Sequence, residues 1–353
     1  MFNYESLSDV EFEALAQDVM SKKLGVELRR FAKGRDGGVD LTNDADKKEI
    51  IVQVKHYYRS TIASLISSLK KEIVNVIENN PKQYYVVTSA TLSVDNNAEI
   101  FQMFQAYMND VNDVVTREDI EDLLQSERYI EIVKKHYKLW LHSTQVLELI
   151  YSGDIETDSQ VCLKDIRENE RILVQTHAYF EALKCLDSSS VLFVTGVPGI
   201  GKTITTQMIV LKYVSEGYKL RYSTDTTDLN ALKKTVFSNH NSPEVILLDD
   251  CFGQYYFDMK QTQGSELVSL IKHVKISQHK VLILNSRLTI LNEAKTISTE
   301  ITRCIDSKDL RIHVIDMDMI SILDRAKILY NHMFFSNIPT EYFDDVQAGR
   351  FYM

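Results

Sequence analysis

The sequence lacks the features that mark several specialised classes of protein. It contains only four cysteines, Cys162, Cys185, Cys251 and Cys304, which lie far apart and form no CxxC pair. This spacing argues against a zinc knuckle or a disulfide framework, so we expect reduced and mostly buried thiols. No apolar run approaches the roughly 20 residues of a membrane helix, and the N-terminal stretch is acidic instead of basic and then apolar. We therefore expect a cytoplasmic protein without a membrane partner.

The sequence also has fewer basic than acidic side chains. The chain has 40 lysine and arginine side chains against 50 aspartate and glutamate side chains, for a formal net charge of -10. This balance argues against a protein coated in positive charge for nonspecific nucleic-acid binding, although a local basic groove stays possible. With 353 residues and 44% hydrophobic content, the chain is long enough for two or three domains with buried cores.

The first part of the chain predicts an α/β domain with the order helix, three strands, helix, strand. Ser8 and Glu11 fit a capping box at the start of the first helix, and Gly25 stops that helix. The three strands that follow read as an antiparallel meander, because a turn-like segment separates the last two. The β-prone stretches begin at Val26, Gly38 and Glu49, the second helix covers residues 61–79, and the last strand begins at Tyr84.

Two further segments follow this first domain. Residues 116–162 are expected to form a helical connector that ends in a polar, turn-rich stretch. From residue 163 onward, fully apolar strands alternate with helices. Alternating βα units of this kind predict a parallel sheet that is covered by helices on both faces. We therefore divide the chain into domains at residues 1–115 and 163–353, joined by the connector.

The second block opens with a phosphate-binding signature. The stretch "GVPGIGKT" satisfies G-x-x-x-x-G-K-[ST] and lies between an apolar strand and an amphipathic helix, which makes the motif a strong one. Gly196, Gly199 and Gly201 belong to a loop whose backbone N–H groups can cradle phosphates. Lys202 can reach the β and γ oxygens, and the Thr203 hydroxyl can ligate Mg²⁺. These residues predict ATP and Mg²⁺ as cofactors.

Polar residues end the next two strands of this block. "VILLDD" places Asp249 and Asp250 after a buried strand, where we assign Asp249 to the magnesium ion and Asp250 to the attacking water. The alternative is two acids in an ordinary turn. A third strand, "VLILNSR", ends in Arg287, which either senses the γ-phosphate or is a surface arginine.

These residues carry a resemblance to a known family. The stretches "VTGVPGIGKTIT", "ILLDDCFGQ", "LILNSR" and "RAKILYNHMFFSNIP" resemble the STAND class of signalling NTPases, and within it the group called nSTAND3. The resemblance implies a switch that holds nucleotide, responds to a ligand through C-terminal repeats, and oligomerises to activate an N-terminal effector. No winged-helix segment or repeat array follows "NIPTEYF". We therefore expect either a short form that relies on a separate sensor or phage-derived trigger protein, or a fragment.

The first block contains an incomplete acid-and-lysine pair. In the strand "IIVQVK", Gln53 and Lys55 share one face, and a hairpin can bring Asp40 of the preceding strand beside them. This layout resembles the core of PD-(D/E)xK nucleases, in which an aspartate and a second oxygen ligand bind Mg²⁺. The lysine of that core orients or deprotonates the attacking water and stabilises charge on the phosphate. Glutamine supplies an oxygen but no charge, so the site should bind the metal more weakly.

More specifically, "EFEAL", "GRDGGVDL", "QVKHY" and "VVTSA" resemble the Mrr-like branch of restriction endonucleases. The resemblance implies that glutamine replaces the second acid and that an acid on the first helix compensates for it. The matching residue is Glu13, for which the alternative is a solvated helix carboxylate. Asp36, beside the glycines, is expected to be a turn residue. A basic cluster precedes the site and either lines a DNA groove or is simply solvated. The cluster comprises Lys22, Lys23, Arg29, Arg30, Lys33 and Arg35, with Glu27 the only acid among them.

Two motifs in one chain lead to the main hypothesis, a Mg²⁺-dependent DNA endonuclease effector controlled by an ATP-binding switch. The resemblances imply a prokaryotic anti-phage or restriction role, slow ATP hydrolysis and assembly into a homo-oligomer on activation. The alternative is a regulatory nucleotide-binding module whose nuclease-like domain binds DNA or a partner without cutting. A DNA-translocating restriction motor is disfavoured, because no helicase motifs are recognisable after Asp250.

Overall fold

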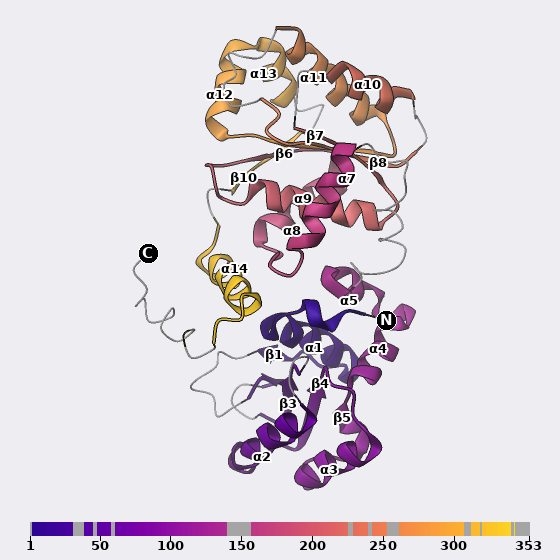
Figure 1. The fold of residues 1–353 in the computed structure, drawn as a ribbon, viewed down its shortest axis with the longest axis vertical. Helices are drawn as coiled ribbons and strands as arrows, with labels where there is room; N and C mark the ends of the chain where they lie inside the picture. The colour runs from indigo at the N-terminus through magenta and orange to yellow at the C-terminus, as the bar shows by residue number, and fades with distance from the viewer. Residues whose placement is uncertain are drawn as a thin grey trace. The chain divides into compact units, whose positions relative to one another are not determined.

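The chain folds into two compact units, Met1–Ser143 and Thr144–Met353, each with its own five-stranded sheet (Figure 1). A computed structural model describes residues 2–30, 39–44, 48–57, 61–139, 157–224, 229–238, 242–252, 261–306, 312–317, 320–339 and 342. Within these ranges no helix has the length and apolar character needed to cross a bilayer. All four cysteines are free and three of them are buried, as the sequence predicted.

The first unit has the predicted element order. After a short 3₁₀ turn, η1 (Tyr4–Ser6), the first helix α1 spans Asp9–Leu24. The Glu11 carboxylate accepts a hydrogen bond from the Ser8 backbone N–H at 2.9 Å, which completes the predicted capping box. Gly25 ends the helix in the left-handed region with φ +69°, a conformation that glycine adopts without steric cost.

The sheet of the first unit runs in the order β1-β2-β3-β4-β5. The first three strands pair antiparallel, as the meander predicted, while β3, β4 and β5 are parallel. The parallel pair β3 and β4 is joined by helix α2, so the order α, three strands, α, strand is confirmed. The bounds are β1 (Arg29–Arg30), β2 (Leu41–Thr42), β3 (Ile50–Lys55), α2 (Ile62–Asn79), β4 (Gln83–Thr88), α3 (Val94–Phe104), η2 (Val111–Asp113) and β5 (Val114–Val115).

Helices cover both faces of this sheet. Val52 and its neighbours on one face pack with α1, whereas Ile51 packs with Leu65 and Leu69 of α2 on the other. The α2 face is therefore a second core instead of an open surface, and Gln53, which shares that face with Ile51, is only 3% exposed. Any chemistry at Gln53 takes place at the end of a buried strand.

Residues that follow β5 complete the first core. The elements here are α4 (Arg117–Gln125), η3 (Glu127–Tyr129), α5 (Ile130–Lys135) and η4 (Tyr137–Leu139). Ile120, Leu124 and Ile132 pack into the same cluster as α1. The sequence predicts a helical connector from residue 116, whereas these apolar side chains extend the first unit past that position.

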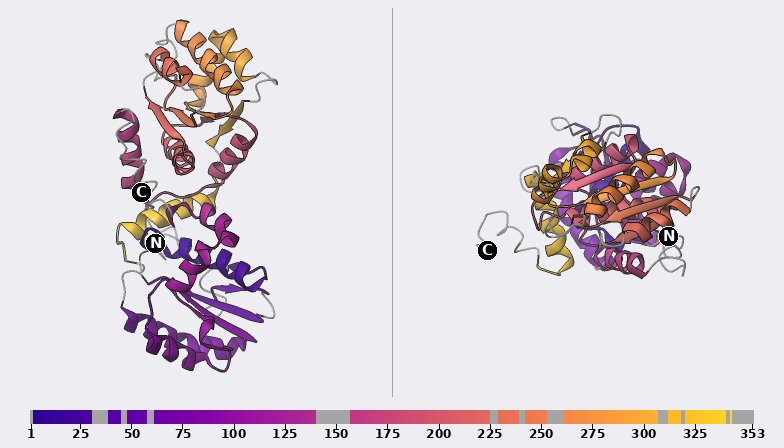
Figure 2. Two further views of the ribbon diagram at one scale, coloured as in Figure 1. Left: turned by 90° about the vertical axis from the view of Figure 1, so that its right-hand side faces the viewer. Right: turned by 90° about the horizontal axis from the view of Figure 1, so that it is seen from above.

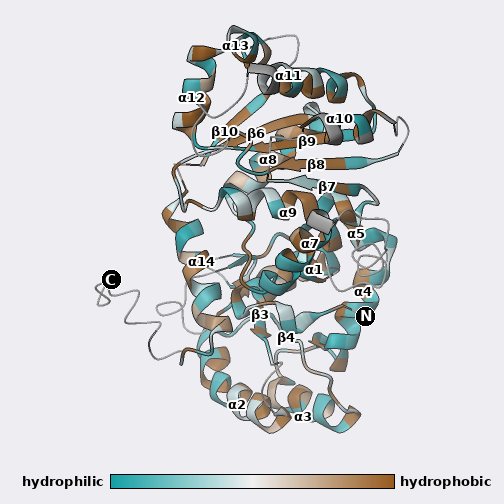
Figure 3. Cartoon of the chain, turned by 45° about the horizontal axis from the view of Figure 1, so that its top comes forward, coloured by the Kyte–Doolittle hydropathy of each residue, from teal (hydrophilic) through white to brown (hydrophobic). Residues whose placement is uncertain are grey.

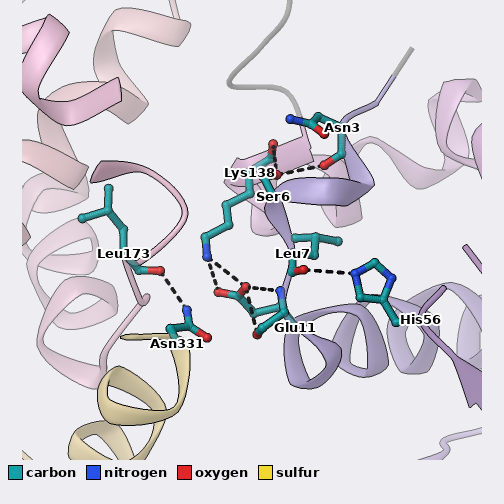
Figure 4. A network of polar contacts seen from close by, with 9 residues as sticks. Asn3, Ser6, Leu7, Glu11, His56, Lys138, Leu173 and Asn331 are labelled. Atoms are coloured by element: carbon teal, nitrogen blue, oxygen red, sulfur yellow. Dashed lines mark hydrogen bonds and ion pairs between the residues drawn. The ribbon is translucent and has the colours of Figure 1, made fainter. Parts of the chain in front are cut away.

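An ion pair ties the end of this unit to the start of α1. The Lys138 ammonium, whose side chain is 2% exposed, donates to both Glu11 oxygens at 2.7 and 2.8 Å (Figure 4). The Ser6 hydroxyl donates to the Lys138 carbonyl, and the Asn3 N–H donates to the Leu139 carbonyl at 3.4 Å. The two ends of the unit are therefore bonded to each other.

The second unit is a parallel sheet between two layers of helices, as the apolar strands predicted. The strand order is β10-β6-β9-β8-β7, and all four pairings are parallel. Figures 1 and 2 show α10 to α13 on one face and α7 to α9 on the other, and the hydropathy colouring of Figure 3 shows the apolar strands between them. The strands are β6 (Val191–Thr195), β7 (Lys219–Ser223), β8 (Glu244–Leu248), β9 (Lys280–Asn285) and β10 (His313–Asp316). The helices are α7 (Thr157–Asn169), α8 (His177–Ser188), α9 (Lys202–Ser215), α10 (Leu229–Ser238), α11 (Gln261–Ile276), α12 (Leu288–Ile297), α13 (Thr299–Ile305) and α14 (Ile322–Phe335).

Three charged side chains are buried at the amino end of this sheet. Glu244 accepts hydrogen bonds from Arg221 Nη2 at 3.1 Å and from Lys280 Nζ at 2.5 Å. The Glu244 and Lys280 side chains are both 0% exposed, and that of Arg221 is 4% exposed. The Glu244 carboxylate therefore pairs with two buried cations.

Replacing this carboxylate should destabilise the second unit strongly. Glu244→Gln removes the negative charge that pairs with Arg221 and Lys280, and we expect a loss of about 3–5 kcal/mol in the free energy of unfolding. Chemical denaturation of the full chain measures it. The matched control is Glu168→Gln, since Glu168 forms an exposed pair with Lys164 at 3.9 Å and should contribute little. Equal losses in the two variants would contradict the prediction.

Two candidate functional sites

The first candidate site lies at the start of β2 and the end of β3. Leu41 pairs with Val52, so the antiparallel register places Asp40 opposite Gln53. Asp40 Oδ2 accepts hydrogen bonds from the Gln53 side-chain amide and from the Val54 backbone N–H, the latter at 2.8 Å. Because the Gln53 nitrogen donates to Asp40, its amide oxygen is the atom that can ligate a cation.

Lys55, at the end of β3, has a partner that the sequence did not indicate. Its ammonium lies 2.9 Å from Glu72 Oε1 on α2. Glu72 also accepts a hydrogen bond from Asn75 at 2.9 Å through its other oxygen. One signal in the sequence could have revealed Glu72, because it occupies the apolar stripe of α2 at helical spacing from Leu69 and Val76.

Oxygen donors in this region suit Mg²⁺. The Asp40 carboxylate and the Gln53 amide oxygen form a hard, oxygen-only set of the kind that magnesium prefers. Among the described residues no group of three or more His, Cys, Asp or Glu side chains is arranged to hold a metal ion. The Asp40 carboxylate and the Gln53 amide oxygen are thus two donors that fit Mg²⁺.

Glu13 lies half-buried on α1, which covers the face of β3 opposite to Gln53 and Lys55. Its role as the compensating acid stays a prediction. Of the basic cluster, Lys23, Arg29 and Arg30 are exposed and Lys22 is half-buried. Arg30 pairs with Leu41, the residue after Asp40, so two exposed arginines run along the sheet edge beside the acid. Lys33, Arg35 and Asp36 lie outside the described residues.

A half-buried histidine fixes the segment that follows Lys55. His56 stacks on the Phe12 ring with centroids 4.8 Å apart. Its Nε2 lies 3.0 Å from the Leu7 carbonyl oxygen (Figure 4). Its Nδ1 lies 2.8 Å from Ser89 Oγ, which also accepts from the Tyr57 N–H. A neutral imidazole with the proton on Nε2 satisfies all of these bonds.

This histidine should make the first unit sensitive to acid. Burial lowers the pKa of His56 to about 4, although the hydrogen bond to Leu7 raises it, whereas an unfolded histidine titrates near 6.5. The unfolded state therefore binds the proton first, and stability falls as the pH drops from about 6.5 towards 4, by roughly 3 kcal/mol in all. Thermal unfolding of wild type and His56→Gln at pH 7.5 and 5 tests this.

The difference in melting temperature between the two pH values should shrink in His56→Gln. His177→Gln is the control, because the side chain of His177 is 76% exposed. An equal drop in wild type and His56→Gln would contradict the assignment of the acid sensitivity to this residue.

The second candidate site is the loop between β6 and α9. Gly196, Gly199 and Gly201 have φ values of 150°, 80° and 94°, which side chains other than glycine rarely tolerate. The Lys202 ammonium donates to the Val197 carbonyl at 2.9 Å, and Lys202 is also the first residue of α9. The positive end of the helix and the loop N–H groups thus face the place where phosphates bind in such loops.

Asp249, the residue after β8, forms a polar trio with Thr203 and Asn285. Thr203 Oγ1 donates to Asp249 Oδ1 at 3.3 Å, and the Asn285 amide donates to the same carboxylate oxygen. Burial raises the pKa of Asp249, and the hydrogen bond from Thr203 opposes this rise. The hydroxyl and carboxylate are adjacent, which fits the pair that holds Mg²⁺ in P-loop NTPases. Asn285, the last residue of β9, thus joins the two residues that the sequence predicts for this site.

Asp250 follows Asp249 in the sequence, and Arg287 lies two residues after Asn285. Asp250 has φ 52°, a left-handed conformation that aspartate tolerates better than most residues. Arg287 is half-buried and occupies the N-cap position of α12. Their assignments to the attacking water and to the γ-phosphate stay predictions.

Comparisons with known proteins match a family to each of the two parts of the chain. Residues 4–106 match a restriction endonuclease family model and residues 173–335 match the model of novel STAND NTPase 3. The chain joins an Mrr-type nuclease domain to an nSTAND3 domain. The nuclease domain contains Asp40, Gln53 and Lys55, and the nSTAND3 domain contains the P-loop and Asp249.

One curated protein resembles part of the chain. The uncharacterized protein y4cD of Sinorhizobium fredii (strain NBRC 101917 / NGR234) is 34% identical over 154 residues. The match covers 44% of this chain and 24% of that protein. The chain therefore spans about a quarter of the length of this relative.

Proposed function

We propose that the chain is a Mg²⁺-dependent DNA endonuclease controlled by an ATP-binding switch, and that it serves prokaryotic anti-phage defence or restriction in the cytoplasm. One observation carries the proposal. Asp40 is hydrogen-bonded to Gln53, and Lys55 follows Gln53 on the same face of β3, in a chain whose other domain has a P-loop beside Asp249.

In the nuclease domain, Asp40 and Gln53 would hold a magnesium ion, with Glu13 as the additional acid. Bound there, Mg²⁺ supplies a Lewis acid and an activated water. Lys55 contributes a positive charge at the end of β3, where it stabilises charge on a phosphate. The exposed Arg29 and Arg30 attract the DNA backbone along the adjacent edge strand.

In the nSTAND3 domain, Lys202 and the loop N–H groups bind the ATP phosphates, while Thr203 and Asp249 would hold the magnesium ion. Asp250 orients water for slow hydrolysis and Arg287 senses the γ-phosphate. ATP binding then favours a homo-oligomer in which the nuclease domains cut. The trigger is a separate sensor or a phage-derived protein.

A second function is favoured by one feature of the nuclease site. Gln53 carries no charge, and the Lys55 ammonium is already paired with Glu72. Such a site suits a regulatory module that binds DNA or a partner protein without cutting it.

Cleavage of supercoiled plasmid separates the two functions. We expect nicked or linear product with Mg²⁺, none with EDTA, and a larger yield with ATP. If assembly is required, the yield should rise more steeply than in proportion to protein concentration. DNA binding in a shift assay without cleavage under every condition would overturn the endonuclease and support the binding module.

A further inference from the structure

An acid interrupts the buried stripe of α2. Leu65, Leu69 and Val76 on this stripe are 0%, 0% and 3% exposed. Glu72 falls between them at helical spacing, and its side chain is 16% exposed. A carboxylate in such a place needs partners, because burial without them is unfavourable.

The partners of Glu72 join α2 to the end of β3. One oxygen pairs with the Lys55 ammonium at 2.9 Å and the other accepts from Asn75 Nδ2 at 2.9 Å. The Lys55 side chain is also 16% exposed. The contact is therefore a largely buried, charge-assisted hydrogen bond, unlike the exposed pair of Lys70 with Glu99, whose side chains are 58% and 45% exposed.

A buried phenol lies on the same face of the sheet as this pair. Tyr84 of β4 is 0% exposed and belongs to the core cluster on the α2 side, and its hydroxyl has no hydrogen-bond partner among the described residues. Burial raises the pKa of Tyr84 well above its ordinary value, and the charges of Glu72 and then Asp40 raise it further. The strand register places Asp40 opposite Gln53, and Gln53 and Lys55 share one face of β3, so Asp40 and the Lys55–Glu72 pair lie on the face of the sheet that α2 covers.

We propose that Glu72 is a positioning residue of the nuclease site, which holds the Lys55 ammonium beside Asp40 and Gln53 and releases it to a DNA phosphate. The proposal rests on the proposed nuclease function. Lysine is a long, flexible side chain, so a fixed partner removes the conformations in which its charge points elsewhere. A phosphate can replace the carboxylate because both present anionic oxygens to the ammonium.

Substitution of Glu72 should separate catalysis from DNA binding. In Glu72→Gln we expect kcat for plasmid cleavage to fall about 10–100-fold, because the reacting charge is no longer held in place. The Kd for DNA should stay the same or tighten slightly, since the substitution removes a negative charge near the phosphates. Glu72→Asp restores the carboxylate and should recover part of kcat. Glu78→Gln, an exposed acid on the same helix, should change neither quantity.

A purely structural role would give a different pattern. If Glu72→Gln and Glu72→Asp both weaken DNA binding and lower the melting temperature together with kcat, Glu72 only supports the fold. A kcat in Glu72→Gln equal to or above that of wild type would also overturn the positioning role.

A second readout keeps the test independent of nuclease activity. Acetylation of Lys55 by acetic anhydride, followed by mass spectrometry of the full chain, reports how firmly the ammonium is held. Lys55 should react several-fold faster in Glu72→Gln than in wild type, while the exposed Lys71 reacts equally in both. If wild type does not cut DNA, the proposed function fails but this comparison still decides the role of Glu72. Equal rates at Lys55 would overturn it.

Discussion

Lys55→Met should abolish DNA cleavage almost completely. Methionine keeps most of the length of lysine but removes the positive charge that we propose stabilises the phosphate. Loss of a charge-stabilising group of this kind costs on the order of a hundredfold to a thousandfold in rate. We expect this to be visible as intact supercoiled plasmid after incubations in which wild type converts the whole sample.

Lys55→Met also lowers the stability of the protein, so its controls must separate this loss from the loss of cleavage. Glu72 loses its partner, and an unpaired, largely buried carboxylate costs about 1–3 kcal/mol in stability. The double variant Lys55→Met, Glu72→Gln replaces both partners and should recover much of the melting temperature without recovering cleavage. Lys71→Met, at an exposed position of α2, should cut normally. Cleavage by the double variant at the wild-type rate would refute the role of Lys55.

Lys202→Ala should weaken nucleotide binding by the second domain. Hydrogen bonds to charged groups contribute roughly 1.5–3 kcal/mol each, which corresponds to about 10–100-fold in Kd. Titration with ATP and Mg²⁺ in a calorimeter measures this loss. Any stimulation of plasmid cleavage by ATP should disappear in the same variant, whereas cleavage without ATP should persist.

Lys212→Ala is the matched control for the P-loop lysine. Lys212 lies on the same helix α9 and pairs with Glu216 at 2.9 Å, away from the loop. It should leave the affinity for ATP unchanged. An ATP affinity in Lys202→Ala within twofold of wild type would show that the loop does not bind nucleotide through this lysine.

The sequence predicted those features of the fold that depend on interactions between residues a few positions apart. The capping box of Ser8 and Glu11, the stop at Gly25 and the loop before Lys202 each depend on residues a few positions apart. The antiparallel pairing of the first three strands also followed, because apolar alternation and turns mark these strands one after another, whereas the two-residue strand β5 was not predicted.

Contacts between distant segments were harder to foresee. Periodicity marks the buried face of α2, but it does not say which strand end that face meets, so the pairing of Glu72 with Lys55 was missed. For the same reason, the packing of Ile120 and Leu124 against α1 was not predicted from their helical pattern. Asn285 gained a role only when β9 was seen to lie beside β8 and to bring its amide to Asp249.

The hydrogen bond between Asn3 and Leu139 holds the two ends of the nuclease unit together. Its entry and exit lie side by side, and the buried pair of Glu11 and Lys138 fastens them at the start of α1. A domain with adjacent ends can be inserted into a foreign chain, or joined end to end and reopened elsewhere, with little strain on its core. The adjacent ends of the nuclease unit therefore suit it to transfer between proteins as a single domain.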